Sequence, residues 1–394
     1  MRTYRRLGEV PRKRHMRFEI DGRPIFEELF GREGFTGPSS LLYHRNMPES
    51  AHDVSAGPAE MISPEHEQVH EHAHLEGFHL QPDGDVVTGR KWLLVNEDIH
   101  IGLAVPVRQQ EVLCVNGSAD EILFMHRGAG TLHTQFGSLP FGRHDYVVIP
   151  RGVIYRVELD SVEDVRILVL EVTGMVDSPD RYRARNGQLT EMSPYSERDF
   201  RAPELLEAGD DGSAEVWLKR AGRVSRYRLD HHPFDLVGWD GTIYPVAFNI
   251  HDFEPRAGRF HVPPPIHQTF QAHNVVICSF VPRKLDWDPQ AVMLPYHHSN
   301  LDSDEVLYYV DGDYAARRGV KQSSFTHHVG GVPHGPQPGA LEASYERARE
   351  TDELAVMIDT FRPLRRTEVA RQITDREYPF SWHTGGMRGT ESIA

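Results

Sequence analysis

The sequence predicts an all-β fold with minor helices, in which two related β-barrels follow one another along the chain. Three observations predict it: short apolar runs rich in Val, Ile, Tyr and Phe, frequent turn residues (33 glycines and 27 prolines), and a faint internal repeat. Regularly spaced short strands separated by turn signals are typical of β-sandwiches and barrels. A chain of 394 residues is long enough for two domains, each with a core of its own.

The strands of this fold are predicted from the apolar runs. These lie at 86–96, 121–128, 146–159, 165–174, 274–283, 304–312 and 353–361. Helical patterns are scarce, and the two best candidates are 24–31 and 340–353. Residues 176–214 are polar and broken by proline and glycine, so we interpret them as a long irregular connection. We therefore predict an N-terminal β-sandwich or degenerate barrel over 1–230 and a C-terminal catalytic barrel over 231–394.

The internal repeat has two parts in each half of the chain. The segment 120–124 (DEILF) matches 304–308 (DEVLY), and in both copies a glycine follows the glutamate by seven residues. Downstream, 152–155 (GVIY) matches 331–334 (GVPH). Two half-motifs of this kind are the signature of a cupin barrel, which is a double-stranded β-helix or jelly roll. The repeat therefore predicts a bicupin.

The second copy of the repeat carries a full set of candidate metal ligands. His298 precedes Glu305 by seven residues, and His334 follows the glycine turn. Two imidazoles and one carboxylate on one face of a metal are typical of non-haem Fe(II) oxygenases. We therefore predict His298, Glu305 and His334 as metal ligands and Fe(II) as the cofactor. The alternative is that they are ordinary polar residues of hairpin loops, but three of them match the cupin pattern together.

The first copy lacks such ligands. Glu121 is present, but no histidine stands shortly before it, and Tyr155 occupies the position of His334. We therefore expect one metal per chain, in the C-terminal half. The segment 65–79 is also rich in histidine, with residues His66, His70, His72, His74 and His79. Because no barrel strand follows it at cupin spacing, we interpret it as a solvated segment or an adventitious metal binder.

Charge and cysteine content exclude several classes of protein. Lys and Arg total 43 and Asp and Glu total 58, which gives a net charge of −15 and disfavours binding to nucleic acid or anionic membranes. Two cysteines, Cys114 and Cys278, exclude a disulfide framework and a thiolate zinc site. They fit a reducing cytoplasm. No apolar run approaches a membrane span, and no apolar segment follows the basic first residues, so we expect neither a membrane helix nor a secretory signal.

Several blocks of the second half resemble one known family, the homogentisate 1,2-dioxygenases, in particular their short bacterial branch. These blocks are PFDLVGWDG (233–241), PYHHSN (295–300), PHGP (333–336) and DTFRPL (359–364). The resemblance implies a cupin-like fold, ferrous iron, and cleavage of the homogentisate ring by O2 to 4-maleylacetoacetate, a step of tyrosine and phenylalanine breakdown. It also implies a homo-oligomer, either a trimer or a pair of trimers.

The resemblance assigns further residues. His261 matches a histidine that works as an acid or base, and His328 matches another active-site histidine. The substrate contacts that it implies are Tyr296, Tyr314, Arg317 and the metal ligand His334. Asp304 competes with Glu305 for the carboxylate position. We choose Glu305, because it keeps the glycine seven residues on and matches Glu121 of the first copy.

Two alternative functions remain at this point. The first is a related ring-cleaving dioxygenase with the same iron, acting on another hydroquinone or hydroxylated aromatic acid. The second is a non-enzymatic bicupin that stores or binds a ligand. The open positions of the predicted triad argue against the second alternative, because a binding protein has no need of an open iron.

Overall fold

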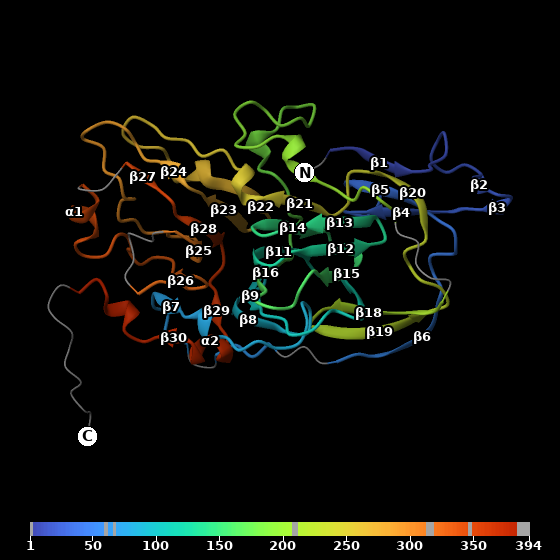
Figure 1. The fold of residues 1–394 in the computed structure, drawn as a ribbon, viewed down its shortest axis with the longest axis horizontal. Helices are drawn as coiled ribbons and strands as arrows, with labels where there is room; N and C mark the ends of the chain where they lie inside the picture. The colour runs from blue at the N-terminus through green and yellow to red at the C-terminus, as the bar shows by residue number, and fades with distance from the viewer. Residues whose placement is uncertain are drawn as a thin grey trace, which may run out of the picture.

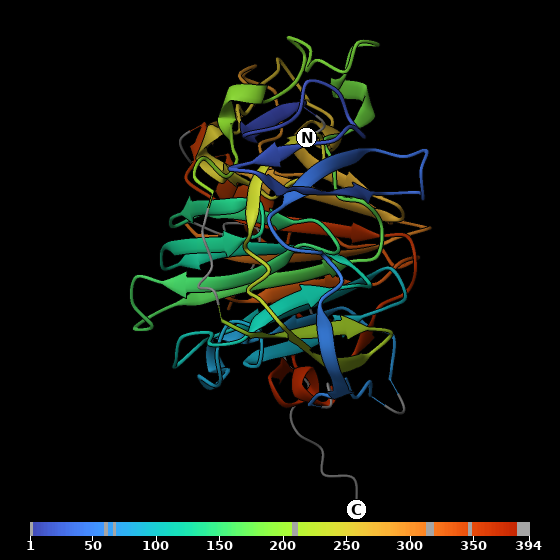
Figure 2. The same cartoon turned by 90° about the vertical axis from the view of Figure 1, so that its right-hand side faces the viewer.

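The computed structural model describes residues 3–58, 62–65, 68–206, 212–312, 319–345 and 349–383. Nearly all of the regular structure in these residues is β, as the sequence predicts, and the helices are short (Figure 1). Three large sheets, here called sheets I, II and III, form layers through the molecule. The view turned by 90° shows their strands stacked through its body (Figure 2). This layered β architecture is the cupin-like fold predicted from the repeat.

Sheets I and II form the first barrel. Sheet I contains seven strands in the order β13 (Gly137–Phe141), β12 (Gly130–Thr134), β15 (Ile154–Leu159), β10 (Leu113–Asn116), β18 (Ala214–Arg220), β19 (Arg223–Leu229) and β6 (Ala51–Ala56). Sheet II contains eight strands in the order β17 (Phe200–Arg201), β21 (Val246–Asn249), β14 (Asp145–Ile149), β11 (Asp120–Arg127), β16 (Arg166–Val172), β9 (Ile99–Ala104), β8 (Arg90–Val95) and β29 (Arg365–Arg366).

Sheet III carries the second barrel. Its seven strands follow the order β22 (Gln268–Ala272), β23 (Val275–Phe280), β28 (Leu354–Thr360), β25 (Asp304–Asp311), β26 (Phe325–His328), β7 (Ala73–Leu75) and β30 (Thr374–Asp375). A smaller, four-stranded sheet consists of β1 (Arg5–Gly8), β20 (Leu236–Gly241), β5 (Ser39–His44) and β4 (Phe26–Gly31). Two ribbons pair β2 (Glu19–Ile20) with β3 (Arg23–Pro24) and β24 (Arg283–Lys284) with β27 (Glu350–Thr351). The α-helices are α1 (Ala340–Ser344) and α2 (Glu368–Gln372).

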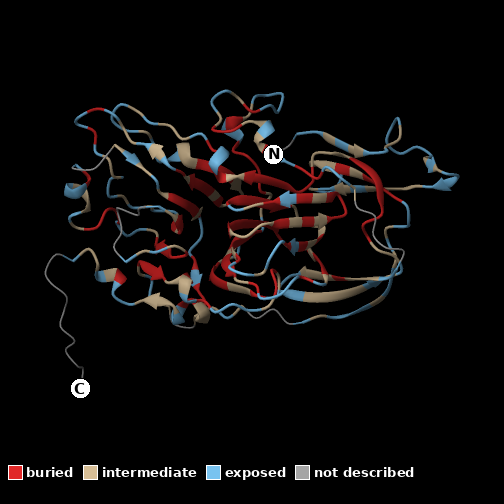
Figure 3. Ribbon diagram, in the orientation of Figure 1, coloured by how far each residue is buried: buried red, intermediate tan, exposed pale blue. Residues whose placement is uncertain are grey.

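Sheet II is covered on both faces. On one side the Tyr155 hydroxyl of sheet I donates to Glu121, and on the other His126 lies 2.6 Å from the Tyr308 hydroxyl of sheet III. A strand covered on both sides is typically apolar along most of its length. β16, with the sequence RILVLEV, is accordingly buried at every residue after the first. Figure 3 shows buried residues concentrated along these central strands.

The internal repeat is visible in the strand pairing. β11 pairs with β14 and β16, and β25 pairs in the same antiparallel way with β26 and β28. Glu121 lies opposite Glu171 of β16, and Glu305 lies opposite Asp359 of β28. The glycines that open the second half-motif, Gly152 and Gly331, have φ of +88° and +80°, a conformation that glycine adopts without strain.

Both helix predictions need correction. Residues 24–31 are not helical: β4 pairs along its whole length with β5. The apolar residues of this segment have helical spacing, but the backbone ladder with β5 prevails, because short apolar runs do not distinguish the two structures. Among the described residues of 340–353, which leave out 346–348, helix is confined to α1, and residues 350–351 form β27.

Strands from the two sides of residue 230 pair with one another. β7 joins sheet III, whereas β21 and β29 join sheet II and β20 joins the four-stranded sheet with β1 and β5. The division into domains 1–230 and 231–394 stays a prediction. One hydrophobic core contains residues from both sides of residue 230. Within the described part of the connection 176–214, the regular structure consists of two short 3-10 helices, β17 and the first residue of β18.

Candidate metal centre

The backbone brings the three predicted ligands together. His298 and His334 pair as an isolated antiparallel bridge with two backbone hydrogen bonds of 2.9 Å. Glu305 is the second residue of β25 and faces this bridge. One ligand atom from each of the three side chains lies within 4.8 Å of the others. Among the described residues, this is the one group of three such side chains that can hold a metal ion.

The ligand atoms have the surroundings that a metal requires. The Nε2 atoms of His298 and His334 lie 3.4 and 3.3 Å from the Glu305 carboxylate. Both ring nitrogens of His334 are buried and have no hydrogen-bond partner among the described residues. Buried polar atoms are rarely left without a partner, and a cation between these groups would give His334 Nε2, the nitrogen that faces Glu305, the partner it lacks. The donor set of two imidazoles and one carboxylate therefore fits a divalent transition metal.

The pKa shift of Glu305 favours metal binding, whereas that of His298 opposes it, because a raised imidazole pKa favours the protonated form that cannot bind a metal. Burial raises the pKa of Glu305, but the close contacts of its carboxylate with His298, His328 and His334 outweigh burial and hold the pKa well below its usual range. The hydrogen bond to Glu305 raises the pKa of His298. Because Glu305 stays ionised, the site offers a permanent negative charge to a cation.

Backbone carbonyls and turns fix the orientation of His298. Its Nδ1 donates to the Tyr296 carbonyl oxygen at 3.3 Å, which leaves the Nε2 lone pair available for a metal. Hydrogen bonds of this kind set the tautomer of metal-binding histidines. His298 is also the one ligand of the three that reaches solvent, with a side chain 32% exposed. The open side of the centre therefore lies at His298.

Asp304 points away from the ligand cluster. Its carboxylate accepts hydrogen bonds from the backbone N–H of Leu364 and Gly330, both at 2.8 Å, and lies 3.0 Å from His327 Nε2. Neighbouring residues of a strand face opposite sides, which explains why Asp304 and Glu305 have different partners. Asp304 holds the segment after β28 and the loop after β26 in place.

His328 lies behind the ligands rather than at the mouth of the site. Its side chain is fully buried, and its Nδ1 donates to Glu305 at 2.9 Å. The hydroxyl of Tyr378 lies 3.2 Å from its other nitrogen and donates to it. Tyr378 had no sequence signal, because it lies fifty residues downstream in a short 3-10 helix. The geometry gives His328 a positioning contact with the metal-binding carboxylate.

His72 was missed as a member of this site. It accepts a hydrogen bond from Val329 N–H and donates to the Pro333 carbonyl, each at 3.3 Å, so it brackets the loop that carries His334. Its ring packs edge-on against His334 at 5.5 Å. The interpretation of 65–79 as a solvated segment is therefore wrong for His72 and His74, which are buried beside β26. The HEHAH pattern of residues 70–74 was the sequence signal that could have identified these two histidines. His70 and His79 are exposed, and His66 lies outside the described residues.

The structure describes two of the residues that are predicted to act on the substrate, Tyr296 and His261. Tyr296 is 55% exposed, and its ring centroid lies 6.2 Å from that of His298. His261 is exposed and lies 5.2 Å from Tyr296 by the same measure. These three rings form a row that leads from solvent to the ligand cluster. Tyr314 and Arg317 lie outside the described residues.

Asp359 is a further acid beside the centre. It lies opposite Glu305 on β28, and burial together with the Glu305 charge raises its pKa to about 7. Its Oδ1 atom is buried without a hydrogen-bond partner among the described residues. Asp359 belongs to the block DTFRPL, but nothing in the sequence predicts a role for it. A carboxyl with such a pKa can exchange protons near neutral pH.

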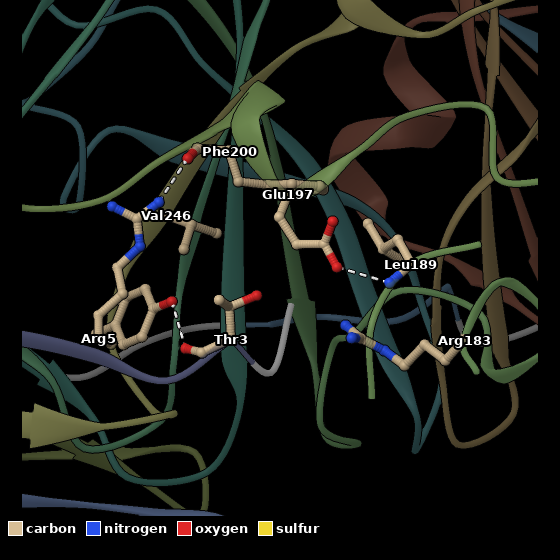
Figure 4. A pocket seen from close by; sticks show the side chains of 8 residues that line it. Thr3, Arg5, Arg183, Leu189, Glu197, Phe200 and Val246 are labelled. Carbon is tan, nitrogen blue, oxygen red and sulfur yellow. Dashed lines mark hydrogen bonds between the residues drawn. The ribbon is translucent and has the colours of Figure 1, made fainter. Parts of the chain in front are cut away.

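A small cavity beside the N-terminal strand β1 cannot hold a substrate. It has a volume of about 10 Å³, enough for roughly one water molecule. Figure 4 shows that Arg5 donates to the Phe200 carbonyl and Glu197 accepts from Leu189 N–H at its wall. The Arg5 contact joins the N-terminal strand to the long connection, and the Glu197 contact lies within that connection. In the described residues, no helix has the length and apolarity that a membrane crossing requires.

Both the sequence and the structure of this chain are similar to those of known proteins. A family model described as the homogentisate 1,2-dioxygenase N-terminal region matches residues 96–250. A protein of Saccharolobus solfataricus that bears the name "Putative dioxygenase" is 37% identical over 97% of this chain and 99% of its own length. The homogentisate 1,2-dioxygenase of Nitrobacter hamburgensis is 28% identical over 64% of this chain and 58% of its own. Among solved structures, a cupin 2 conserved barrel domain protein from Leptotrichia buccalis is 9% identical and covers 75% of this chain and 99% of its own, with a TM-score of 0.33.

Proposed function

The chain belongs to the homogentisate 1,2-dioxygenase family, and from this premise we propose that it is an Fe(II)-dependent enzyme that opens the ring of homogentisate with O2 to give 4-maleylacetoacetate. One observation carries the proposal: two imidazoles and a carboxylate converge within 4.8 Å at a position that reaches solvent through His298. This donor set is the one that non-haem oxygenases use. We also propose that the protein forms a homo-trimer or a pair of trimers.

His298, Glu305 and His334 would hold the iron. When bound, ferrous iron relays electrons between an aromatic ring and O2 and lowers the pKa of a coordinated hydroxyl. Glu305 contributes the negative charge, and His328 fixes its carboxylate from behind through the 2.9 Å hydrogen bond. His72 fixes the loop that carries His334. These contacts keep the ligand geometry in place before the substrate arrives.

The row of exposed rings would receive the substrate. Tyr296 contacts the face of the aromatic ring, and His261 accepts a proton from a substrate hydroxyl at one of its ring nitrogens. Both residues lie on the solvent side of His298. Tyr314 and Arg317 complete the proposed substrate contacts, and the positive charge of Arg317 would attract the acid substrate. A positioned acid or base of this kind contributes about 10²–10⁴-fold to a rate.

The test is oxygen consumption by the Fe(II)-loaded protein. Homogentisate should consume one O2 per molecule, and mass spectrometry should find both oxygen atoms in the product. The matched control is Glu305→Ala, which should bind no stoichiometric iron and consume no O2. Iron binding without O2 uptake on any hydroquinone would contradict the proposal. Light scattering of the same preparation measures the mass of the assembly.

A related substrate is the second candidate, and one observation favours it. The homogentisate 1,2-dioxygenase of N. hamburgensis matches 64% of this chain, whereas the S. solfataricus relative matches 97%. Gentisate and other hydroxylated aromatic acids should therefore be assayed beside homogentisate. A kcat/KM for one of them well above that for homogentisate would assign the enzyme to that substrate.

A further inference from the structure

The first barrel contains a structural copy of the metal centre in which the carboxylate is kept and both histidines are replaced. Cys114 precedes Glu121 by seven residues, as His298 precedes Glu305. Cys114 pairs with Tyr155 across the strands β10 and β15, as His298 pairs with His334. The Tyr155 hydroxyl donates to the Glu121 carboxylate at 2.5 Å. Cys114, Glu121 and Tyr155 thus occupy the positions of the first barrel that correspond to the three ligands of the second barrel.

A guanidinium group takes the place of a metal ion in this copy. Arg90 of β8 donates to Glu121 at 2.6 Å, to Glu171 at 3.1 Å and to the Tyr155 hydroxyl at 3.0 Å. Its side chain is 4% exposed. Burial raises the pKa of Glu121, but the charge and hydrogen bond of Arg90 outweigh it and lower the pKa to about 2. The cluster therefore stays ionised, and Arg90 supplies the positive charge that a metal would supply.

A cavity of about 340 Å³ lies above this cluster, between sheets I and II. This volume falls within the range of small-molecule sites, about 300–1,000 Å³. Arg90, Glu121 and Tyr155 contribute to its lining, and two tryptophans, Trp92 and Trp217, contribute aromatic surface. The structural copy has thus kept the pocket of a cupin barrel while its metal position is closed by Arg90.

The charges of the lining indicate what the cavity binds. Its charged residues are two cations, Arg90 and Lys219, and one carboxylate, Glu121. Glu171, the counterion of Lys219 at 2.6 Å, is 3% exposed and does not line the cavity. The Lys219 ammonium lies 5.1 Å from the Trp92 ring centroid, so the positive charge and the aromatic surface are adjacent. Such a combination favours an anion that carries an aromatic ring.

We propose that the first barrel is a second binding site, separate from the metal centre, for a small aromatic carboxylate. Lys219 holds the carboxylate, and Trp92 and Trp217 contact the ring. Binding involves no covalent step, because Arg90 blocks the metal position. The inference depends on neither the metal nor the substrate of the second barrel.

The test is titration calorimetry of the full chain with phenylacetate, and the Glu305→Ala variant separates the two barrels. Phenylacetate should bind wild type and Glu305→Ala at the first barrel with the same affinity. Lys219→Gln should weaken this binding about 10-fold or more, because a charge-assisted contact is lost. Trp217→Leu should weaken it to a similar extent, and the charge-conserving Lys219→Arg should retain most of it.

Lys91→Gln is the matched control, because Lys91 lies on β8 next to Arg90, pairs with Asp83 and does not line the cavity. It should bind phenylacetate as wild type does. Three outcomes would overturn the proposal: no binding to Glu305→Ala, unchanged binding to both Lys219→Gln and Trp217→Leu, or binding of neutral phenylacetamide as tight as that of phenylacetate. If Lys219→Gln does not fold, Trp217→Leu and the phenylacetamide comparison decide the question.

Discussion

Glu305 is the residue on which the candidate metal centre depends. His298, His328 and His334 all lie within 3.4 Å of its carboxylate, and the hydrogen bonds among them keep it ionised. His298 and His334 can turn their Nε2 lone pairs to a cation, whereas His328 donates its proton to the carboxylate. One carboxylate therefore serves both as a ligand and as the point at which the buried histidine holds the site.

The neighbouring acids Asp304 and Glu305 should respond differently to substitution. Glu305→Ala should lose metal binding with the fold retained, because it removes one of three ligands. Asp304→Ala should keep the metal but lose about 2–4 kcal/mol of unfolding free energy, because two backbone N–H groups and His327 lose a buried acceptor. Metal analysis and urea unfolding of both variants check this. Loss of metal in Asp304→Ala alone would place the ligand one residue earlier.

His261→Ala should keep the metal and lose turnover. His261 is exposed and lies beyond Tyr296 from the ligand cluster, so its removal leaves the three ligands in place. If it accepts the substrate proton, kcat should fall about 10²–10⁴-fold. Metal content and single-turnover kinetics on one preparation measure both quantities. A normal kcat would exclude His261 as the base, and loss of the metal would make it a ligand.

At the scale of elements, β7 links the first part of the chain to the metal centre. It pairs with β26, and His72 just before it brackets the loop between Val329 and Pro333. His72→Ala should therefore lower metal affinity about 10–100-fold, as loss of residues that orient metal ligands typically does. The matched control is His70→Ala, an exposed position of the same segment. Equal metal affinity of the two variants would contradict a role for His72.

The elements that the sequence predicts are those with local signals. Each of the seven apolar runs contains a strand, and the repeat locates β11 and β25 as equivalent strands. The pattern around Glu305 is also local, since its spacing to His298 and to the glycine turn is set within one hairpin and its loops. The glycine seven residues after Glu305 and its match to Glu121 were the reasons to prefer Glu305 to Asp304, and alternation along β25 explains why only one of the two faces the other ligands.

The elements that escaped prediction depend on distant contacts. The hydrogen bond between Val329 and His72 joins residues 257 positions apart, and no local pattern indicates such a partner. Tyr378 reaches His328 from a 3-10 helix without periodicity. The segment 24–31 has helical spacing but becomes β4, because β5 offers it a complete ladder. Each of these cases is decided by tertiary pairing, which outweighs local propensity.

At the scale of the whole molecule, the four-stranded sheet joins the two ends of the first 241 residues. His44 of β5 lies at this junction. Its Nδ1 is 2.8 Å from Asp235, which precedes β20, and its Nε2 is 3.0 Å from Glu28 of β4. Its side chain is 7% exposed. The hairpin of β4 and β5 and the distant segment before β20 therefore share one buried imidazole between two carboxylates.

This arrangement predicts how the stability of the molecule depends on pH. Burial lowers the pKa of His44, but the hydrogen bonds to Asp235 and Glu28 outweigh it and raise the pKa to about 9. The folded state thus holds a proton that the unfolded chain releases near pH 6.5. The stabilisation is fully present below about pH 6.5 and is lost as the pH rises through about 9. Its size is about 3 kcal/mol, because each pKa unit corresponds to about 1.4 kcal/mol.

Urea unfolding of wild type and His44→Gln between pH 6 and pH 10 tests this dependence. Contributions from the metal ligands and other groups are common to both proteins and cancel in the difference. The difference in unfolding free energy should be largest near pH 6 and should shrink as the pH rises through about 9. His15→Gln is the matched control, because His15 is 97% exposed beside Glu27, and it should match wild type throughout. A difference between wild type and His44→Gln that stays constant with pH would show that His44 is neutral in the folded protein.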